Sequence, residues 1–315
     1  MSAIVFDHVV KKYGSVEALR DVSFSVAAGE MFGLIGPDGA GKTTAIRAIC
    51  GLVHTDAGSI KVLGADPVKQ HRDVTGSVGY LSQRFSLYGD LSIDENIAFF
   101  AEIHGVRDYH GRRDRLLEMT QLSPFRSRLA EQLSGGMKQK LALACTLVHE
   151  PKVIVLDEPT TGVDPVSRRE FWKLLSQFLA QGITILMSTP YLDEAERCTR
   201  IALLHEGKVL ALDKPGNLRS SLAGVLFEVI VPSAREATDK LINRPGIMSA
   251  QVFGDRLHVW IDHGDRDAAM RILNDASRAA GVVPTSVRAI VPSLEDVFIA
   301  KLAAEDTRAT EGTES

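Results

Sequence analysis

The sequence predicts an α/β fold with a mostly parallel central sheet, followed by a smaller α+β unit. Three observations support this prediction. Short apolar segments alternate with helical ones from residue 153 to residue 205, which is typical of parallel strands covered by helices on both faces. A glycine-rich loop near residue 36 joins a short apolar strand to a helix. Beyond residue 222 a different set of strands and helices begins, so the chain is expected to divide there into two domains.

The first 30 residues alternate apolar and polar side chains, which predicts antiparallel strands with turns at Tyr13-Gly14 and Ala27-Ala28-Gly29. The next apolar strand is Met31–Ile35, and a helix follows the glycine-rich loop at residues 43–52. A helical subdomain is expected at about residues 91–150. The elements expected after it are strand 153–156, helix 168–180, strand 183–187, helix 192–198 and strand 201–205.

The second domain, residues 223–303, is predicted to be a small α+β unit. Its expected strands are 225–231, 248–253 and 257–261, and its expected helices are 234–242, 266–280 and 294–303. Ser293 and Asp296 stand three residues apart at the start of the last helix and resemble a capping box. The polar tail, residues 304–315, has almost nothing to bury, and we expect it to be disordered.

Composition is typical of a soluble globular protein, with 45% hydrophobic and 24% charged residues. The net charge of −4 gives no reason to expect binding to nucleic acid. Cys50, Cys145 and Cys198 lack CxxC spacing, so we expect free thiols in a reducing compartment. No apolar run approaches the roughly 20 residues that cross a bilayer, and the first residues do not resemble a secretory signal. If the protein acts at a membrane, another chain is expected to supply the spanning part.

The strongest motif is GPDGAGKTT at residues 36–44, which matches G-x-x-x-x-G-K-[ST] between a strand and a helix. Glycines let backbone N–H groups turn towards phosphate oxygens, and a helix N-terminus favours an anion. Lys42 is expected to neutralise the β- and γ-phosphates of ATP, and the Thr43 hydroxyl is expected to bind Mg²⁺. The expected ATP-binding residues of this loop are Gly36, Pro37, Asp38, Gly39, Ala40, Gly41, Lys42, Thr43 and Thr44.

Two acids follow a second apolar strand, in VIVLDEPTTGVD at residues 153–164. Asp157, at the strand end, is expected to hold Mg²⁺ through water. Glu158 is one residue further on, and we expect it to polarise the water that attacks the γ-phosphate, as the catalytic base. Alone, the two acids are interpreted equally well as a solvated turn, but the P-loop motif beside them favours the catalytic role.

A second glycine-rich helix start, LSGGMKQK, occupies residues 133–140 and begins with Leu133, Ser134, Gly135 and Gly136. A helix N-terminus of this kind suits an anion. One chain with one P-loop has no obvious use for two such ends in a single site. We therefore expect two chains to form a sandwich in which this segment closes on the partner's ATP.

Together these motifs resemble the nucleotide-binding subunit of an ABC transporter, over about residues 3–222. The resemblance implies the ABC-type P-loop NTPase fold in a domain of residues 1–222, with a mostly parallel core, an antiparallel β subdomain and the helical subdomain. It also implies ATP hydrolysis with Mg²⁺ held by Thr43, Gln83 and Asp157, partly through water.

The resemblance assigns roles to further residues. Tyr13 matches the aromatic residue that stacks on adenine, although a lone tyrosine is otherwise more often a core residue. Gln83, in YLSQRFSLY, matches the glutamine that touches Mg²⁺ and couples to the membrane partner. Residues 84–88 would then line the groove that receives a cytoplasmic helix of that partner. Asp164 matches the loop aspartate that crosses the dimer interface.

Several residues depart from the family pattern. Asp38 stands where asparagine is common and places an acid near the expected phosphates. Met137 replaces the usual glutamine and Lys140 the usual arginine, and both changes resemble the exporter branch of the family. The second domain, which ends in PSLEDVFIAKL, also resembles the C-terminal extension of ATPases of the ABC-2 exporter class.

Pro190, in ILMSTPYLDEAE, stands where the family normally carries a histidine that contacts the γ-phosphate. Proline has no polar side chain and no N–H, so it donates nothing to a phosphate. It is favoured in the first turn of a helix, with Ser188 or Thr189 as the cap. A charge-assisted hydrogen bond contributes roughly 1.5–3 kcal/mol, so we expect slow hydrolysis. In a homodimer both sites would lack the histidine. In a heterodimer, which we favour, only the site built on this chain's P-loop would lack it.

The expected function is an energy-coupling ATPase, peripheral at the cytoplasmic face of the cell membrane. Its expected partners are an ABC-type ATPase chain, in a homo- or heterodimer, and integral membrane permease subunits. One alternative is a soluble ABC protein acting on ribosomes or DNA, which the single nucleotide domain and the negative charge disfavour. Another is a nucleotide-binding switch with little hydrolysis, which Pro190 favours. The sequence does not identify the transported substrate.

Overall fold

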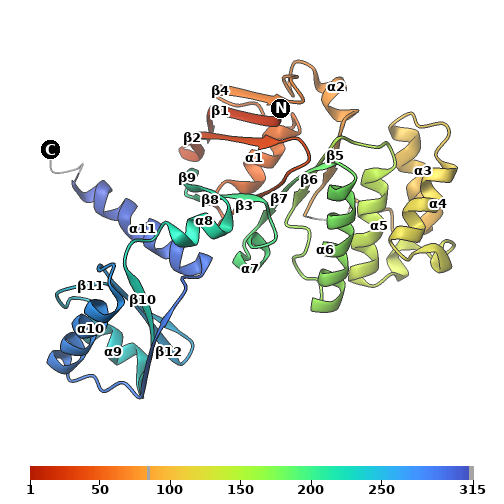
Figure 1. The fold of residues 1–315 in the computed structure, drawn as a ribbon. Coiled ribbons are helices and arrows are strands. Elements are labelled where there is room, and N and C mark those ends of the chain that lie inside the picture. The colour runs from red at the N-terminus through yellow and green to blue at the C-terminus, as the bar shows by residue number, and fades with distance from the viewer. Residues whose placement is uncertain (84–85, 312–315) are drawn as a thin grey trace. The chain divides into compact units, whose positions relative to one another are not determined.

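The computed structural model describes residues 1–83 and 86–311, and the chain divides into two compact units, Met1–Lys214 and Pro215–Ser315 (Figure 1). The boundary lies before the predicted one at residue 222, because helix α8 (Pro215–Ser220) packs on α11 of the second unit. Each unit has its own buried core.

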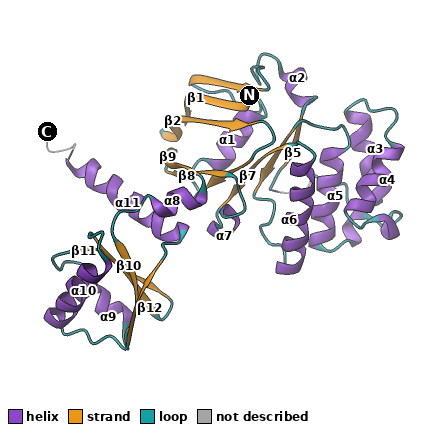
Figure 2. Ribbon diagram, viewed as in Figure 1, coloured by secondary structure: helices purple, strands orange, loops and turns teal. Residues whose placement is uncertain are grey.

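The central sheet of the first unit has six strands in the order β5-β6-β7-β3-β8-β9 (Figure 2). All neighbouring pairs are parallel except β8 and β9, which form an antiparallel pair, so the predicted mostly parallel core is confirmed. Carboxyl ends of parallel strands share one edge of a sheet, where ligands bind in such folds. The strands are β3 (Met31–Ile35), β5 (Val78–Leu81), β6 (Val153–Asp157), β7 (Thr184–Thr189), β8 (Arg200–His205) and β9 (Lys208–Asp213).

A second, antiparallel sheet is formed by β2 (Val16–Ala27), β1 (Ser2–Tyr13) and β4 (Ala57–Val62), in that order. Helix α1 (Lys42–Ile49) contacts both sheets, through β2 and β4 on one side and β6 and β7 on the other. Its buried apolar residues therefore join the two sheets in one core. Stacked rings of Phe6, Phe24 and Phe32 continue this core, with centroids 4.5 and 5.3 Å apart.

The predicted helical subdomain contains α3 (Ile93–Ile103), α4 (His110–Met119) and α5 (Gly135–Leu147). Helix α5 packs on both of the others and also on β5 and α6 (Pro165–Ala180), so it ties the subdomain to the central sheet. The short helices α2 (His71–Thr75) and α7 (Leu192–Ala195) complete the first unit. Within the described residues, no helix combines the length and hydropathy needed to cross a membrane.

The second unit has a four-stranded antiparallel sheet in the order β11-β12-β10-β13. Buried residues of α9 and α10, such as Leu241 and Leu273, pack on the strand residues Phe227 and Leu257 to form its core. The elements are β10 (Val225–Ile230), α9 (Ala234–Leu241), β11 (Ile247–Phe253), β12 (Arg256–Ile261), α10 (Arg266–Ala280), β13 (Ser286–Ile290) and α11 (Leu294–Glu311).

The start of α11 agrees with its sequence, but its end does not. The Ser293 backbone N–H donates to Asp296 Oδ2 over 2.8 Å, and the Asp296 N–H donates to Ser293 Oγ over 3.2 Å, which is a capping box. The helix then continues to Glu311, so the expectation that residues 304–315 are disordered is wrong up to residue 311. Alanine, glutamate and arginine in this stretch are strong helix formers, and the backbone hydrogen bonds of a helix form within the helix itself. Residues 312–315 lie outside the described part of the chain.

Candidate functional site

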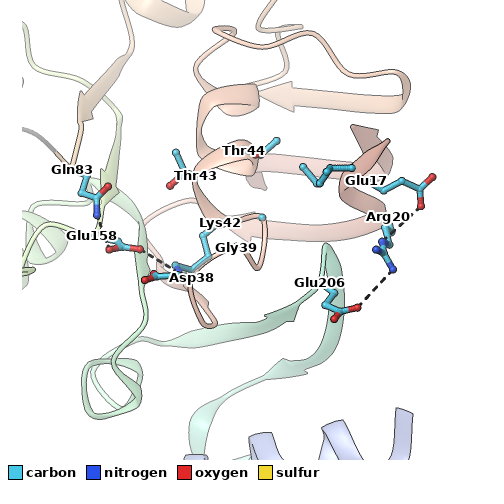
Figure 3. A pocket seen from close by; sticks show the side chains of 13 residues that line it. Glu17, Arg20, Asp38, Gly39, Lys42, Thr43, Thr44, Gln83, Glu158 and Glu206 are labelled. Carbon is cyan, nitrogen blue, oxygen red and sulfur yellow. Dashed lines mark hydrogen bonds and ion pairs between the residues drawn. The ribbon is translucent and has the colours of Figure 1, made fainter. Parts of the chain in front are cut away.

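The glycine-rich loop runs from the carboxyl end of β3 into α1 and forms one wall of a cavity of about 570 Å³ (Figure 3). Two of its positions accept only glycine. A Cβ atom on Gly36 would lie 2.2 Å from the Leu204 carbonyl oxygen, and one on Gly41 would lie 2.4 Å from that of Ala18. Gly41 also has a φ of +100°, in the left-handed region. The cavity-lining residues of the loop are Asp38, Gly39, Gly41, Lys42, Thr43 and Thr44.

The Lys42 ammonium lies at the centre of the loop and is only 4% exposed. It donates to the carbonyl oxygens of Gly36 and Pro37 over 2.8 and 3.0 Å, and it lies 3.2 Å from Glu158 Oε1. The loop thus curls around a buried cation beside an open cavity. This arrangement fits a phosphate group, which would exchange these neutral carbonyl contacts for charged ones.

Glu158 links the loop to Gln83 on the far side of the cavity, as Figure 3 shows. Gln83 Nε2 donates to Glu158 Oε2 over 3.0 Å, so the carboxylate lies between an amide and an ammonium group. The Glu158 backbone has a φ of +48° and its N–H is held by Ser188, through the carbonyl oxygen at 3.1 Å and Oγ at 3.0 Å. A non-glycine residue in this region is strained, which is common at functional positions.

The residues predicted to hold Mg²⁺ are adjacent in the structure. Thr43 Oγ1 donates to Asp157 Oδ1 over 3.1 Å, and Ser188 Oγ donates to the same oxygen over 2.6 Å. Gln83, the third predicted ligand, lines the same cavity as Thr43. Hydroxyl, carboxylate and amide oxygens are hard ligands, and one or two carboxylates beside a phosphate are the usual Mg²⁺ arrangement. The residues therefore fit this ion.

Sequence reasoning missed part of the cavity wall. The start of β2 supplies Val16, Glu17, Ala18 and Arg20, and the turn between β8 and β9 supplies Glu206. An Arg20 side-chain nitrogen lies 3.7 Å from a Glu17 carboxylate oxygen and another lies 3.9 Å from one of Glu206, so this wall is charged. The two segments belong to different sheets and meet where the Arg20 N–H donates to the Gly207 carbonyl oxygen over 2.7 Å, and the sequence shows no signal for this contact.

Tyr13 is not among the described residues that line the cavity. Its side chain is 47% exposed at the end of β1, paired across the turn with Val16, which does line the cavity. The Lys11 ammonium lies 5.2 Å from the centre of its ring. The Tyr13 ring is thus accessible beside the mouth of the cavity, and Tyr13 does not belong to the core. Of residues 84–88, Arg84 and Phe85 lie outside the described part of the chain.

The signature segment, residues 133–136, is absent from the described lining of the cavity. Ser134 caps α5 by accepting a hydrogen bond from the Met137 N–H over 3.3 Å, and Gly135 is exposed. The Lys140 ammonium pairs with Glu170 on α6. One chain therefore does not bring this helix N-terminus to its own P-loop.

Asp164 begins α6 as its N-cap and accepts hydrogen bonds from the N–H groups of Val166 and Ser167, over 3.0 and 2.9 Å. Hydrogen bonds from Ser167 hold the pKa of this carboxyl below its usual range. The exposed acid thus stands at the end of the loop that starts at Glu158.

Pro190 lies between β7 and α7 rather than in the first turn of a helix, because the N-cap of α7 is Tyr191. The predicted caps are also wrong. The Ser188 hydroxyl donates to Asp157, and the Thr189 hydroxyl donates to Glu194 Oε2 over 2.7 Å. The Gly36 N–H donates to the Thr189 carbonyl oxygen over 3.4 Å, so this junction adjoins the start of the P-loop.

Comparisons with known proteins agree on one family. The family model described as ABC transporter matches residues 19–161. The probable multidrug ABC transporter ATP-binding protein YbhF of Escherichia coli (strain K12) is 39% identical over 306 residues, which cover 95% of this chain and 52% of that protein. The daunorubicin resistance ATP-binding protein DrrA3 of Streptomyces coeruleorubidus is 34% identical over 313 residues, or 98% of each chain.

A solved ATP-binding cassette, described as a dimer in a post-hydrolysis state bound to ADP and Pi, superposes with a TM-score of 0.58. It is 27% identical and covers 67% of this chain and 98% of its own. The chain spans about half the length of YbhF but nearly all of DrrA3. On these similarities, the chain belongs to the ABC transporter family, among its ATP-binding proteins.

Proposed function

We propose that this chain binds and hydrolyses ATP and that it drives an ABC-2-type membrane exporter. The observation that carries the proposal is the convergence of Lys42, Glu158 and Gln83 with the Thr43–Asp157 pair around one cavity. These groups supply a cation for the phosphates, a base for water and oxygen ligands for a metal.

In the proposed reaction, the loop amides and Lys42 bind the β- and γ-phosphates of ATP. Mg²⁺, held by Thr43, Gln83 and Asp157, would neutralise charge on these phosphates. Glu158 accepts a proton from the attacking water, and its strained backbone, held by Ser188, fixes the direction of the carboxylate. Tyr13 stacks on the adenine at the cavity mouth.

Two chains pair head to tail, so that Ser134, Gly135 and Gly136 of each close on the ATP held by the other. The absence of this segment from the described lining of its own cavity supports the pairing, as does the dimeric state of the solved cassette. Asp164, exposed at the start of α6, crosses the interface beside the partner's P-loop.

The exporter assignment rests on the names of the relatives, a probable multidrug transporter protein and a daunorubicin resistance protein. In this proposal the chain lies peripherally at the cytoplasmic face of the membrane, bound to integral permease subunits. Gln83 and the loop after it transmit the closing and opening of the dimer to those subunits.

Pro190 makes hydrolysis slow in the site built on this chain's P-loop. A partner chain that keeps a histidine there would turn over ATP faster in the site that this chain's signature segment completes, so the pair would be asymmetric. A second candidate function follows from the same residue. Without such a partner, the chain would act as a nucleotide-binding switch, with ATP bound and almost no turnover.

The test is steady-state phosphate release by the purified chain, alone and with its co-purified membrane subunits. We expect ATP-dependent turnover that Glu158→Gln lowers by about a hundredfold or more, with binding of ATP retained. Lys42→Ala is expected to weaken ATP binding itself. ATP binding without turnover in both preparations would favour the switch. Binding to nucleic acid that weakens steeply with salt would favour a ribosome- or DNA-directed protein instead.

A further inference from the structure

A buried acid, Glu194, follows the Pro190 junction, and the proposed function leaves it without a role. It lies on the short helix α7 and is 1% exposed. Carboxylates are rarely buried this deeply unless hydrogen bonds or charges compensate them. Its contacts therefore identify what holds it in place.

Each carboxylate oxygen of Glu194 accepts a hydrogen bond from a buried threonine hydroxyl. Thr160 Oγ1 donates to Oε1 over 2.6 Å, and Thr189 Oγ1 donates to Oε2 over 2.7 Å. The Arg168 guanidinium stands nearby, with its Nε atom 3.7 Å from Oε1 and its Cζ atom 5.0 Å from the centre of the Tyr191 ring. Two short hydrogen bonds from neutral hydroxyls and one nearby cation thus compensate the buried negative charge of Glu194.

The two threonines belong to different parts of the site. Thr189 directly precedes Pro190, and its Oγ1 also accepts the Tyr191 N–H over 3.1 Å, so it holds both sides of the junction. Thr160 lies in the loop between Glu158 and Asp164. The Thr161 hydroxyl of the same loop lies 3.4 Å from Glu158 Oε2. Glu194 therefore connects the Pro190 junction to the 158–164 loop, which carries the proposed base.

The same loop is also bound to the signature helix. The Gln139 side-chain amide on α5 donates to the Pro159 carbonyl oxygen. Helix α5 begins at Ser134, and Arg168, beside Glu194, lies on α6, which begins at Asp164. These contacts thus link the 158–164 loop to the signature segment at the start of α5, to Asp164 at the start of α6 and to the Pro190 junction.

We propose that Glu194 is a positioning residue that holds the Pro190 junction and the 158–164 loop in a fixed position relative to each other. It acts through Thr160 on the placement of the Glu158 carboxylate. This role rests on the proposed ATP hydrolysis, but the joining of the two segments is a property of the chain itself. Pro190 contributes no polar side chain. Ser188 Oγ accepts the Glu158 N–H at the start of the loop, and the Glu194 bridge adds a second polar side-chain connection, which reaches Thr160.

The test uses Thr160→Val, which removes one of the two donors while Glu194 keeps the other. In the full-length protein, hydrogen exchange is expected to speed up in residues 159–164 and also in residues 188–191, on the other side of the bridge. We expect kcat for ATP to fall by about tenfold with KM changed by less than about twofold, because the lost contact orients the base rather than binding ATP.

Two variants serve as controls. Thr160→Ser keeps the hydroxyl and is expected to recover most of the loss in both measurements. Asp193→Asn changes an exposed acid on the same helix and is expected to leave exchange and turnover as in the wild type. Faster exchange confined to residues 159–164 would overturn the proposal, as would equal losses for Thr160→Val and Thr160→Ser. If the wild type hydrolyses no ATP, the proposed function fails, and the exchange experiment still decides whether the two segments are joined.

Discussion

At the scale of single residues, the site combines a strained glutamate, which we propose as the base, with a neighbouring position that lacks a side-chain hydrogen-bond donor. Glu158 has a positive φ and is held between Lys42 and Gln83. Such strain persists only where surrounding contacts fix it, and Ser188 supplies two of them. Pro190 directly follows the neighbouring strand β7 and has no polar side chain to offer a phosphate. If Glu158 is the base, as we propose, its carboxylate is already fixed in place, whereas the side chain at position 190 gives the γ-phosphate no hydrogen bond.

The consequence of Pro190 is testable by restoring the histidine. We expect Pro190→His to raise kcat by about ten- to a hundredfold with little change in KM, because the added donor acts mainly in the transition state. Steady-state phosphate release at saturating ATP measures this. Tyr191→His, one residue further on, places an imidazole beside the junction and is the control, with no comparable gain expected. Full turnover by the wild type that Pro190→His does not increase would contradict the prediction.

The motifs predict the residues of the site better than its internal contacts. Lys42, Thr43 and Asp157 lie where the patterns place them, because strand–loop–helix motifs fix their own local geometry. The bond from Ser188 to Asp157 and the one from Thr160 to Glu194 join residues about 30 positions apart. Such contacts depend on which strands are neighbours, and a single sequence does not specify strand order.

At the scale of elements, the two glycines at the start of α5 differ in the space around them: Gly135 has room for a side chain and Gly136 has none. A Cβ atom on Gly136 would lie 2.2 Å from Ser167 Oγ on α6, whereas nothing lies within 4 Å of one on Gly135. The two helices therefore approach each other closely at Gly136. Gly135 is left open to a partner.

This difference predicts opposite effects of two alanine substitutions. Gly136→Ala is expected to destabilise the protein by about 1–3 kcal/mol through overpacking. Gly135→Ala is expected to leave stability unchanged or slightly improved, since alanine is the better helix former. Chemical denaturation measures both. Adding Ser167→Gly should recover the loss in Gly136→Ala, and a failure to recover would show that the helix contact is not its cause.

The carboxyl end of α5 predicts a dependence of stability on pH. Burial, together with the positive charges of His104 and Arg112, lowers the pKa of His149 from its ordinary 6.5 to about 4. Its ring stacks on that of His104 at 3.8 Å, and its Nδ1 atom is buried without a hydrogen-bond partner. The unfolded chain therefore takes up a proton below pH 6.5, whereas the folded chain does so only near pH 4.

The contribution of neutral His149 to the free energy of unfolding is fully present above pH 6.5 and is lost as the pH falls towards 4. His149→Gln, which does not titrate, is expected to show a smaller fall in melting temperature between pH 7 and pH 5 than the wild type. His54→Gln changes an exposed histidine and should match the wild-type profile. Identical profiles for His149→Gln and the wild type would contradict the assignment.

Among the elements, those with clear periodicity or a motif are predicted well, and short polar ones are not. Residues 266–280 were predicted as a helix, and α10 has these bounds because its apolar residues recur on one buried face. The sequence pattern does not predict strands β4, β5, β9 and β13, each of which lies at an edge of its sheet. Most residues of β4, β9 and β13 are exposed or half-exposed, so the pattern of these strands lacks a continuous apolar side. Strand β5 is mostly buried but has only four residues, too few for a clear periodicity.

At the scale of the whole molecule, the proposed reaction needs two copies of the first unit or one copy and a related partner. The described cavity is bounded by the P-loop, Gln83, Glu158, the start of β2 and the turn between β8 and β9. The signature helix presents Gly135 to solvent elsewhere. Each composite site would then take its P-loop from one chain and its signature segment from the other. A chain with a defective P-loop and a chain with a defective signature segment would therefore form one intact site when they pair.

Complementation tests this arrangement directly. Lys42→Ala removes the phosphate-binding cation, and Gly135→Asp adds a negative charge where the partner's triphosphate would lie. An acid at a helix N-terminus does not destabilise the helix, so both variants should fold. As homodimers, each has two defective sites, and we expect ATP retention near background. A mixed dimer has one site with a sound P-loop and a sound signature segment.

In an equal mixture, half of the dimers are mixed and each has one sound site, so retention of labelled ATP should reach about a quarter of the wild-type level. Retention is the better readout because we propose that Pro190 slows turnover. Gly111→Asp adds the same charge at an exposed glycine in the first turn of α4, outside both segments, and is the matched control that should retain ATP as the wild type does. If the mixture retains no more ATP than the two variants measured apart, the sites are not shared between chains, and the head-to-tail dimer is wrong.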